Sequence, residues 1–330
     1  MDTVLVTGGA GYIGSHTCKL LHQSGFTPVA YDNLSTGNKE NAKWGPLVRG
    51  DVRDRDQLKY AIKLWQPVCV IHFAASAYVG ESTVDPRKYY SNNVAGILSL
   101  LDTCVEIKLR NIVFSSSCAT YGIPARLPIA EGSPQLPINP YGRTKLIGEM
   151  MLKDYASAYN LRYVALRYFN AAGADIDGEL REWHDPETHL IPRALMAAAG
   201  RIPELTVFGD DYDTPDGTCI RDYVHVTDLA QAHVSAVQHL IAGGKNMAAN
   251  LGSGQGTSVR QIIDTIERLT RRCVPVRCEA RREGDPPALY SDLKVAQSEL
   301  HFTPRFSDIE TIIRTAAPTF GLEVAHDVLV

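Results

Sequence analysis

The chain has 330 residues and a mass of 36.2 kDa, more than one ordinary core supports, so we expect about two domains. Apolar residues make up 45% and charged residues 21%, proportions that exclude a disordered chain, a coiled coil and a collagen-like polymer. The 33 Lys and Arg against 37 Asp and Glu give a net charge of −4. Since no overall basic field attracts nucleic acid, nucleic acid is not expected as a partner.

No stretch approaches the about 18 consecutive apolar residues that a membrane span needs, and the first residues lack the basic and apolar regions of a signal peptide. We therefore expect no membrane association. The seven cysteines form no CxxC pair, and no Cys/His group has the spacing of a zinc site, so we expect no metal site. Reduced thiols of this kind are typical of a cytoplasmic protein. The cysteines are Cys18, Cys69, Cys104, Cys118, Cys219, Cys273 and Cys278.

Short β-branched runs alternate with helical patterns through the first two thirds of the chain, which predicts an α/β fold with a doubly wound parallel sheet (Rossmann). The expected strands are 4–7, 28–32, 47–51, 68–73, 112–116 and 163–168. The expected helices are 12–24, 54–65, 85–107 and 141–159.

The last third has a different texture, which indicates a second, smaller domain beginning near residue 170. Loops rich in Gly, Pro and Asp are expected at 173–188, 209–219 and 281–287. Short helices are expected between them, near 189–199, 227–241 and 258–270.

Glycines follow the first strand with the spacing GxxGxxG, at Gly8, Gly11 and Gly14. Such a turn lets a backbone approach a pyrophosphate and presents the N-terminus of a helix to its charge. A tight turn without a ligand has the same sequence, but here a strand precedes the glycines and a helical pattern follows. The second strand ends at Asp32, where a carboxylate binds ribose hydroxyls and repels a 2′-phosphate. The pattern therefore predicts NAD rather than NADP.

Other expected strand ends suit the same ligand, because open α/β sheets bind ligands at the carboxyl ends of their strands. Asp51 and Val52 end the third strand, where adenine contacts are expected. The small residues after Phe73, Ala74 and Ala75, leave room for the diphosphate and ribose.

Tyr141 and Lys145 are four residues apart, so they share one face of the helix expected at 141–159. The core stripe of that helix is expected to comprise Leu146, Ile147, Met150, Met151 and Tyr155. A serine-rich strand end, Ser115 to Ser117, precedes this helix by one crossover. The pair is common by chance, but its position after a nucleotide-binding turn favours a catalytic role.

A free phenol has a pKa of about 10, so it is a poor base at neutral pH. A nearby ammonium and an oxidised nicotinamide both favour the phenolate, and bringing the pKa to about 7 takes about 4 kcal/mol. Tyr141 is then expected to take the proton of a substrate hydroxyl while hydride leaves the same carbon. A serine at the neighbouring strand end can bond the same oxygen.

The motifs TGGAGYIG, FSSSCATYG, YGRTK and RYFNAAGA, together with Asp32, resemble the extended short-chain dehydrogenase/reductase family. More narrowly, the chain resembles the UDP-glucose (UDP-galactose) 4-epimerases nearly from end to end. The resemblance implies NAD-dependent interconversion of UDP-glucose and UDP-galactose by C4 oxidation, rotation of the 4-keto intermediate and re-reduction.

The resemblance also assigns roles, residue by residue, to positions that match the family's motifs. The catalytic positions are Tyr141, Lys145 and Ser117. Those expected to bind NAD are Gly8, Gly11, Tyr12, Ile13, Gly14, Asp32, Asn33, Asp51, Val52, Phe73, Ala74, Ala75, Asn92, Ser115, Tyr141, Lys145 and Tyr168. Those expected to bind the UDP-sugar are Ser117, Tyr141, Asn170, His189, Leu190, Phe208, Arg221, Arg282, Asp285 and Leu289.

The same resemblance implies a division into two domains. Residues 1–169 with about 220–250 form an NAD-binding Rossmann domain, and about 170–219 with 251–330 form a UDP-sugar-binding domain. It further implies a homodimer joined through the helices at 85–107 and 141–159.

Several positions depart from the pattern usual for hexose epimerases. Ala77 replaces a lysine near the NAD diphosphate, Cys118 an alanine, and His189 an asparagine, while Leu289 has intermediate bulk where N-acetylated sugars are gated. UDP-xylose/UDP-arabinose or UDP-GlcNAc/UDP-GalNAc epimerisation therefore stays open. An NDP-sugar dehydratase is disfavoured because Cys118-Ala119 stands where an Asp-Glu pair is typical. A non-catalytic NAD sensor would not need Tyr141 and Lys145.

Overall fold

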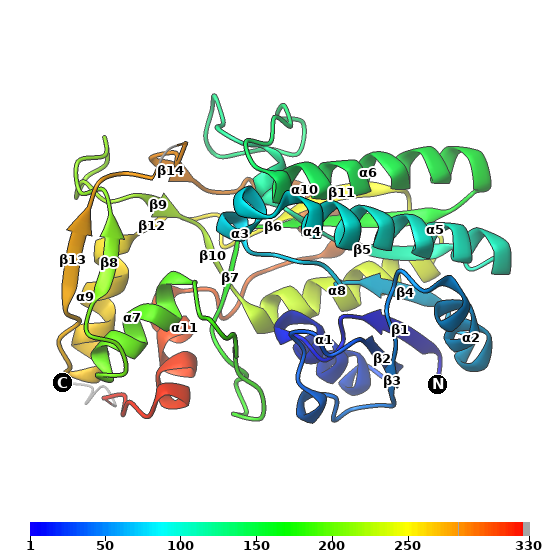
Figure 1. Cartoon of the computed structure of the whole chain (residues 1–330), viewed down its shortest axis with the longest axis horizontal. Helices are drawn as coiled ribbons and strands as arrows, with labels where there is room; N and C mark the ends of the chain where they lie inside the picture. Colours follow the sequence, from blue (N-terminus) through cyan, green and yellow to red (C-terminus); the bar gives the residue numbers. More distant parts are fainter. Residues whose placement is uncertain (283, 326–330) are drawn as a thin grey trace.

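A twisted sheet of seven parallel strands dominates the computed structural model, which describes residues 1–282 and 284–325 (Figure 1). The strand order is β11-β6-β5-β4-β1-β2-β3. The strands are β1 (Thr3–Thr7), β2 (Thr27–Asp32), β3 (Leu47–Arg49), β4 (Cys69–His72), β5 (Asn111–Ser117), β6 (Arg162–Tyr168) and β11 (Met247–Leu251). This is the doubly wound α/β fold that the alternating pattern predicts.

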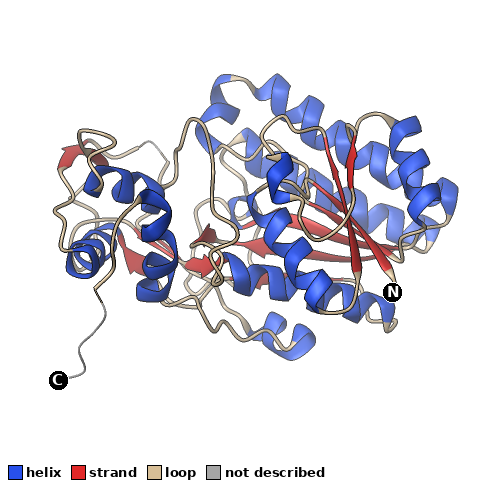
Figure 2. Ribbon diagram, turned by 90° about the horizontal axis from the view of Figure 1, so that it is seen from below, coloured by secondary structure: helices blue, strands red, loops and turns tan. Residues whose placement is uncertain are grey.

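Both faces of the sheet are buried beneath helices, which is why its strands read as nearly continuous apolar runs (Figure 2). Val4 and Val6 pack into the core on one face and Leu5 into the core on the other. One face is covered by α1 (Tyr12–Gln23), α8 (Val226–Ile241) and α10 (Lys294–Leu300). The opposite face is covered by α2 (Arg55–Trp65), α5 (Ala95–Ile107) and α6 (Pro140–Tyr159).

A second group of elements packs beyond the carboxyl ends of these strands, around its own apolar core. Its strands are short and pair in twos and threes: β10 with β7, β12 with β9 and β14, and β13 with β8. They are β7 (Asn170–Ala172), β8 (Leu205–Phe208), β9 (Ile220–Arg221), β10 (Tyr223–His225), β12 (Thr257–Ser258), β13 (Val276–Glu279) and β14 (Ala288–Leu289). The helices are α7 (Leu190–Ala198), α9 (Val259–Thr270) and α11 (Ile309–Ala316), followed by the 3-10 turn η4 (Ala317–Phe320).

Sequence patterns locate the long elements well and miss the short ones. The strand expected at 47–51 ends at Arg49, so Asp51 lies beyond it. The helix expected at 85–107 is divided into α4 (Pro86–Tyr89), the π-helical turn η2 (Tyr90–Val94) and α5. None of the strands in the second group was expected, because each has at most five residues. The expected loop at 281–287 includes residue 283, which lies outside the described residues.

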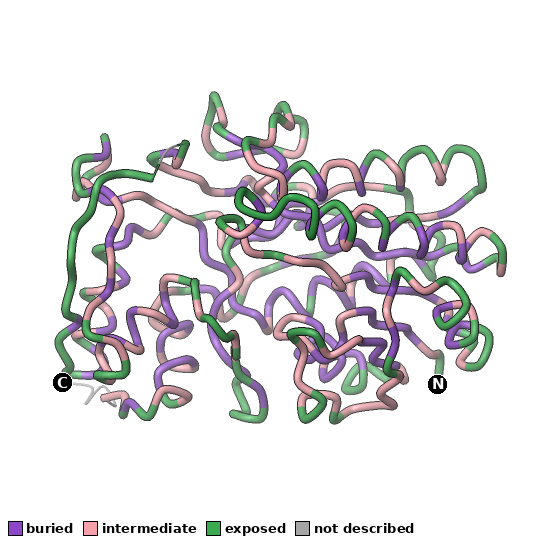
Figure 3. The backbone as a smooth tube through the Cα atoms, viewed as in Figure 1, coloured by how far each residue is buried: buried purple, intermediate pink, exposed green. Residues whose placement is uncertain are grey.

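The expected core stripe of α6 is confirmed only in part, because Met151 and Tyr155 pack against the core but Leu146, Ile147 and Met150 do not. Met150 is 57% exposed, and Leu146 and Ile147 are only half-buried. The buried face instead carries Lys145 and Glu149. The first turns of the helix therefore bury polar side chains against the sheet, and Leu152 continues the same face with an apolar one. Figure 3 shows how buried and exposed positions are distributed along the chain.

Among the described residues, no helix combines the length and the apolar character that crossing a membrane requires.

Four histidines are buried in the interior of the protein. Burial lowers the pKa of all four, to about 3 for His72 and to about 4 for His16, His225 and His233. These side chains are therefore neutral in the folded protein at neutral pH.

We expect these histidines to make the fold acid-sensitive. In the unfolded chain a histidine pKa is about 6.5, so between pH 6.5 and 4 the unfolded state binds more protons than the folded state. The stability that they confer is present above pH 6.5 and is lost as the pH falls. His233→Gln should lower the slope of unfolding free energy against pH by up to about 1.4 kcal/mol per pH unit. Denaturant unfolding at pH 5 and 6 measures the slope. The exposed His22→Gln is the control, and equal slopes in all three proteins would contradict the expectation.

Candidate functional site

The glycine-rich turn between β1 and α1 is built from backbone contacts that a side chain would break. Gly8 has a φ of +73° and donates its N–H to the Tyr31 carbonyl at 2.8 Å. A Cβ on Gly14 would lie 2.1 Å from the Gly8 carbonyl oxygen, so α1 approaches the turn only because this position is glycine. At Gly11 a Cβ would meet only that oxygen, at 3.3 Å, and would otherwise enter open space. Gly8 and Gly14 thus shape the turn, and Gly11 keeps its outer side open.

The N-terminus of α1 fits an anion. Gly11 is the N-cap, no side chain caps the first turn, and that turn contains no acidic residue. The first N–H groups of the helix and the positive end of its dipole are therefore available to a diphosphate.

Asp32 lies at the end of β2, 7% exposed, with one backbone N–H bound to each carboxylate oxygen. These donors are Ala10 at 3.0 Å and Leu34 at 2.8 Å. Burial raises the pKa of this carboxyl, and the two N–H groups oppose that effect. Each oxygen keeps a lone pair for a further donor, as the binding of two ribose hydroxyls requires.

Asn33 and Asp51 bond each other beside Asp32, at 3.2 Å between Nδ2 and Oδ2. Arg53 also binds Asp51, and this contact holds the pKa of that carboxyl well below its usual range. Val52 is buried in the core. These three predicted cofactor positions thus lie together at the β2–β3 edge, although the side chains of Asn33 and Asp51 are engaged with protein partners.

The remaining predicted cofactor positions line the carboxyl ends of β4, β5 and β6. A Cβ on Gly8 would lie 2.8 Å from the Ala74 nitrogen, so the glycine turn touches the segment after β4. Phe73 packs against His233, with 4.6 Å between the ring centroids. Asn92 lies in the π-helical turn η2, with its Nδ2 at 3.5 Å from Ser76 Oγ. Such turns are frequent at functional sites because they re-aim one side chain.

Tyr141, Lys145 and the serines of β5 come together where α6 crosses the end of that strand. Lys145 is 3% exposed, and its Nζ donates to the Ser115 carbonyl at 2.6 Å. The same Nζ lies 5.3 Å from the centroid of the Phe114 ring and 5.8 Å from that of Tyr141. The Ser117 side chain lies close enough to the Tyr141 phenol to lower its pKa by hydrogen bonding. The three predicted catalytic residues thus form one cluster.

Electrostatics in this cluster oppose the simple expectation of an acidic phenol. Burial raises the pKa of Tyr141 to about 12, and the Ser117 hydrogen bond only partly offsets this. Burial also lowers the pKa of Lys145 to about 7, against the attraction of Glu149. The chain alone therefore leaves the phenol protonated and the amine only partly charged at neutral pH. A further positive charge must approach before the phenol can act as a base.

A buried ion pair that the sequence did not reveal supports this cluster from behind. Arg167 on β6 forms a bidentate pair with Glu149 on α6, at 2.9 and 2.6 Å, and both side chains are more than nine-tenths buried. Ser116 also donates to Glu149, and Arg167 reaches the Tyr121 hydroxyl at 2.8 Å. These bonds fix α6 to β5 and β6 one turn beyond Lys145.

The predicted substrate residues of the second group form a basic and aromatic cluster. The Arg282 guanidinium lies 3.9 Å from the centroid of the Phe208 ring, and Arg221 forms an ion pair with Asp285. Leu289 pairs with Arg221 across β14 and β9. Asn170, on β7, is exposed and bonds Asp222 through its backbone N–H at 2.9 Å.

Cys118, next to the catalytic serines, packs in the same small core as Leu289. Burial raises the pKa of its thiol to about 12. Because thiolate is the reactive form, this favours a packing role over an oxidation site.

The expected loop at 173–188 folds back onto the glycine turn. Lys19 of α1, 2% exposed, binds Asp175 at 2.8 Å and Asp177 at 2.6 Å, and the Tyr12 hydroxyl donates to the Gly173 carbonyl at 2.6 Å. His189 caps α7 and pairs with Glu182 and Glu187, while Leu190 packs in the core of the second group. These acidic and histidine contacts were not expected, because the sequence search considered only Cys/His spacings.

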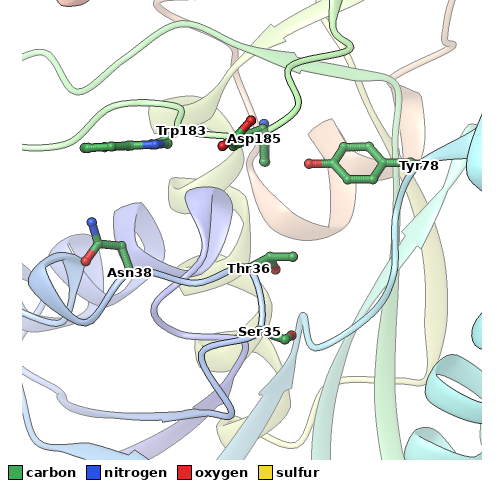
Figure 4. Close-up of a pocket in the computed structure, with 7 residues that line it drawn as sticks. Ser35, Thr36, Asn38, Tyr78, Trp183 and Asp185 are labelled. Carbon is green, nitrogen blue, oxygen red and sulfur yellow. The ribbon is translucent and has the colours of Figure 1, made fainter.

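A cavity of about 210 Å³ lies between this loop and the segment after β2 (Figure 4). Trp183 and Asp185 bound one side and Ser35, Thr36 and Asn38 the other, with the Tyr78 hydroxyl directed toward Asp185. Because β2 ends at Asp32, this cavity borders the adenosine end of the predicted cofactor site.

Comparison with known proteins agrees with this geometry. Residues 4–252 match the family model described as the NAD dependent epimerase/dehydratase family. A UDP-glucose 4-epimerase from Rhizobium meliloti (strain 1021) is 51% identical over 315 residues, covering 96% of each chain.

Two solved structures are also similar. One is a UDP-glucose 4-epimerase from Brucella ovis in complex with NAD, with a TM-score of 0.97 and 66% identity, covering 98% of this chain and 100% of that one. The other is a UDP-glucose-4-epimerase from Stenotrophomonas maltophila with bound NAD and formylated UDP-arabinopyranose. Its TM-score is 0.94 and its identity 38%, covering 97% and 98% of the two chains. The chain belongs to the NAD dependent epimerase/dehydratase family.

Two glycine substitutions separate the shape of the turn from its ligand. Gly14→Ala forces the turn open and should destabilise the fold by about 1–3 kcal/mol while abolishing NAD retention. Gly11→Ala should fold with near-normal stability yet lose NAD, because its methyl group enters the ligand's space. Thermal unfolding and the NAD content of the purified protein measure the two effects. Gly132→Ala, with nothing within 4 Å, is the control. Normal NAD content in Gly11→Ala would contradict the assignment.

Proposed function

We propose that this member of the epimerase/dehydratase family interconverts UDP-glucose and UDP-galactose by NAD-dependent oxidation and re-reduction at C4 of the sugar. The observation that carries the proposal is the buried cluster of Tyr141, Lys145 and Ser117 at the carboxyl edge of a dinucleotide-binding sheet. A UDP-glucose 4-epimerase at 51% identity over nearly the whole chain supports the same activity.

The described residues fit NAD along its whole length. The uncapped N-terminus of α1 and the open side of Gly11 suit the diphosphate, and the two free lone-pair positions of Asp32 suit a ribose without a 2′-phosphate. Toward the other end, Ser115, Tyr168 and Asn92 surround the strand ends beside Tyr141. Ser115 and Tyr141 both influence the pKa of Tyr168, so Ser115, Tyr141 and Tyr168 are neighbours.

The second cluster suits a uridine diphosphate. Arg221 and Arg282 supply two guanidinium groups for the diphosphate, and the Phe208 face offers a stacking surface for a base. Asp285, which neutralises Arg221 in the free protein, is placed to accept ribose hydroxyls once the diphosphate takes over the arginine. We include Asn170, His189, Leu190 and Leu289 in the same substrate site.

Tyr141 moves the proton of the sugar's 4-hydroxyl. Its pKa of about 12 in the chain alone keeps the phenol neutral until positive charge arrives, and the Ser117 hydroxyl stabilises the phenolate that then forms. Bound NAD supplies the hydride acceptor for C4 and a positive charge beside the phenol. The Ser115 carbonyl fixes Lys145 beneath the ring, so its charge adds to this effect without rearrangement. Because UDP is held by the second cluster, the sugar is free to turn over and be re-reduced.

Two alternative substrates merit direct tests. The Stenotrophomonas structure contains formylated UDP-arabinopyranose, and the intermediate bulk of Leu289 does not decide between plain and N-acetylated sugars. Wild-type protein should therefore be assayed with UDP-galactose, UDP-N-acetylgalactosamine and UDP-arabinose. Conversion of UDP-galactose at the highest kcat/KM is the expected result.

We propose that residues 1–169 with about 220–250 carry NAD and that about 170–219 with 251–330 carry the UDP-sugar. In support, α8 and β11 pack with the seven-stranded sheet, and the second cluster belongs to the shorter strands. We also propose a cytoplasmic location, with which seven free cysteines agree.

A homodimer is the third part of the proposal. The outward faces of α5 and α6 expose Leu98 by 42% and Met150 by 57%, and Tyr90 of η2, which precedes α5, by 39%. Such neighbouring apolar side chains favour burial against the same surface of a second copy, as a four-helix contact.

Tyr141→Phe keeps the ring but removes the proton-transferring oxygen. The conversion of UDP-galactose to UDP-glucose should fall by at least about 1,000-fold, in the range expected for loss of a general base. NAD content and UDP affinity should change less than threefold. Tyr155→Phe, on the same helix and bonded to Asp102, is the matched control and should keep its activity. Near-normal epimerisation by the Tyr141→Phe protein would refute the proposed base.

Met150→Glu places a charge on the outward face of α6 and should convert the dimer to a monomer. Sedimentation or light scattering at micromolar concentration measures the mass. Leu64→Glu, at a site 58% exposed on α2, is the matched control and should leave the mass unchanged. A wild-type protein that is monomeric, or a Met150→Glu protein that stays dimeric, would contradict the interface.

A further inference from the structure

Two histidines and two glutamates within residues 182–189 direct their ligand atoms at a common centre. One nitrogen or oxygen from each of Glu182, His184, Glu187 and His189 lies within 4.8 Å of every other. The spacing is E-x-H-x-x-E-x-H, a pattern that a search for Cys/His zinc motifs passes over. From this arrangement we infer a binding site for one divalent transition-metal ion, best suited to Zn²⁺.

The separations match tetrahedral coordination. Zinc bonds imidazole nitrogen and carboxylate oxygen at about 2.0–2.1 Å, which places neighbouring ligand atoms about 3.3 Å apart. Glu182 Oε1 lies 3.2 Å from His184 Nδ1 and 2.9 Å from His189 Nδ1. Glu187 Oε2 lies 3.5 Å from His184 Nδ1, and its other oxygen, Oε1, lies 2.9 Å from His189 Nδ1. Because Oε1 also accepts two backbone N–H groups, Oε2 is the oxygen that would bind the ion. Although burial opposes it, the neighbouring carboxylates raise the pKa of His184 to about 9 and that of His189 to about 10. A divalent cation would therefore replace two protons and keep the charge of the cluster balanced.

The two carboxylates of the cluster lie close together and are largely shielded from water. The side chains of Glu182 and Glu187 are only 7% and 8% exposed, so their charges are largely removed from water. Among the described residues, the two histidines are the only ion-pair partners of these carboxylates. His184 Nδ1 is buried and lacks a hydrogen bond of proper geometry, although both carboxylates are within ion-pair distance. His184 Nδ1 thus lies 3.2 and 3.5 Å from the two carboxylates without a well-directed hydrogen bond to either, and a bound metal ion would give it a partner.

The residues around the ligands hold them in place. Backbone N–H groups of Thr188 and His189 donate to Glu187 at 2.7 and 2.8 Å. The ring of Tyr78 packs edge-on against His184, at 5.8 Å between centroids, and Tyr12 does so at 6.2 Å. Since such outer contacts fix ligand orientation, the site is preorganised rather than assembled by the ion.

The position suggests a structural role. Four protein ligands fill a tetrahedral ion, so the ion itself would not bind substrate. His189 would then serve the proposed substrate site by positioning the adjacent Leu190, and not through its own ring. Tyr12 is the first residue of α1, so the ion would lock residues 182–189 against the glycine turn. The neighbouring acidic group, Asp175, Asp177 and Glu179, already binds the Lys19 ammonium and serves as an internal contrast.

Full-length protein stripped with EDTA, dialysed and titrated with Zn²⁺ tests this site. We expect one Zn²⁺ per chain by elemental analysis and a higher Tm in the loaded protein. Co²⁺ in place of zinc should give the intense visible absorption of tetrahedral coordination. His184→Gln should weaken binding at least about 100-fold, since losing a direct ligand exceeds the 10–100-fold effect of an outer contact. The matched control Asp177→Asn should keep stoichiometry, affinity and spectrum.

Three results of this titration would contradict the proposed metal site. A wild-type chain that binds no Zn²⁺, or a Co²⁺ spectrum of octahedral type, would overturn it. Equal loss of binding in His184→Gln and Asp177→Asn would assign the ion elsewhere. These readouts do not depend on epimerase activity, so the proposed function and the metal site stand or fall separately. A positive result would revise the expectation from the sequence that the chain carries no metal site.

Discussion

Burial of the Lys145 amine against the end of β5 is the constraint that orders the active site. Its Nζ is tied to the Ser115 carbonyl at 2.6 Å and lies near the Phe114 ring, so α6 cannot rotate without losing both contacts. The Arg167–Glu149 pair repeats this constraint one turn later. Tyr141, one turn earlier, is then fixed over the strand end with Ser117 beside it. The cost is an amine whose pKa falls to about 7, so the phenol depends on charge that the chain does not supply.

The same constraint explains the outer surface of α6. Side chains three and four residues apart share a face, so Lys145, Glu149 and Leu152 occupy the buried face of α6 and the residues between them do not. Leu146, Ile147 and Met150 therefore face outward beside the exposed Leu98 of α5. The proposed dimer interface and the catalytic face are thus two sides of one helix. A mutation at the proposed interface that rotates or shifts α6 would therefore also displace Tyr141.

Sequence patterns predicted the large sheet well because its strands are buried on both faces, so their apolar runs leave little ambiguity. Gly14 and Asp32 were identifiable because a ligand-binding turn imposes sterically unique residues. Leu146, Ile147 and Met150 of α6 were wrongly assigned to the core, because a periodic apolar pattern does not show whether a helix face packs on the protein's own core or on a partner. The strands from β7 to β14 were not predicted, because runs of two to five residues carry too little periodicity. The partners of Lys19 and Arg167 are distant in sequence, and only the fold brings them together.

The loop between β7 and α7 joins the two proposed halves of the reaction. It belongs to the UDP-sugar side by sequence, yet Lys19 and Tyr12 of α1 hold it against the cofactor turn. An enzyme that returns its hydride to the same sugar gains nothing from releasing the cofactor in each cycle. The ion pairs of Lys19 with residues 175–179, and the contacts of Tyr12 with Gly173 and His184, hold this loop against the cofactor turn and do not involve the Arg221 and Arg282 cluster. The separate fastenings therefore fit a protein that retains one ligand and exchanges the other.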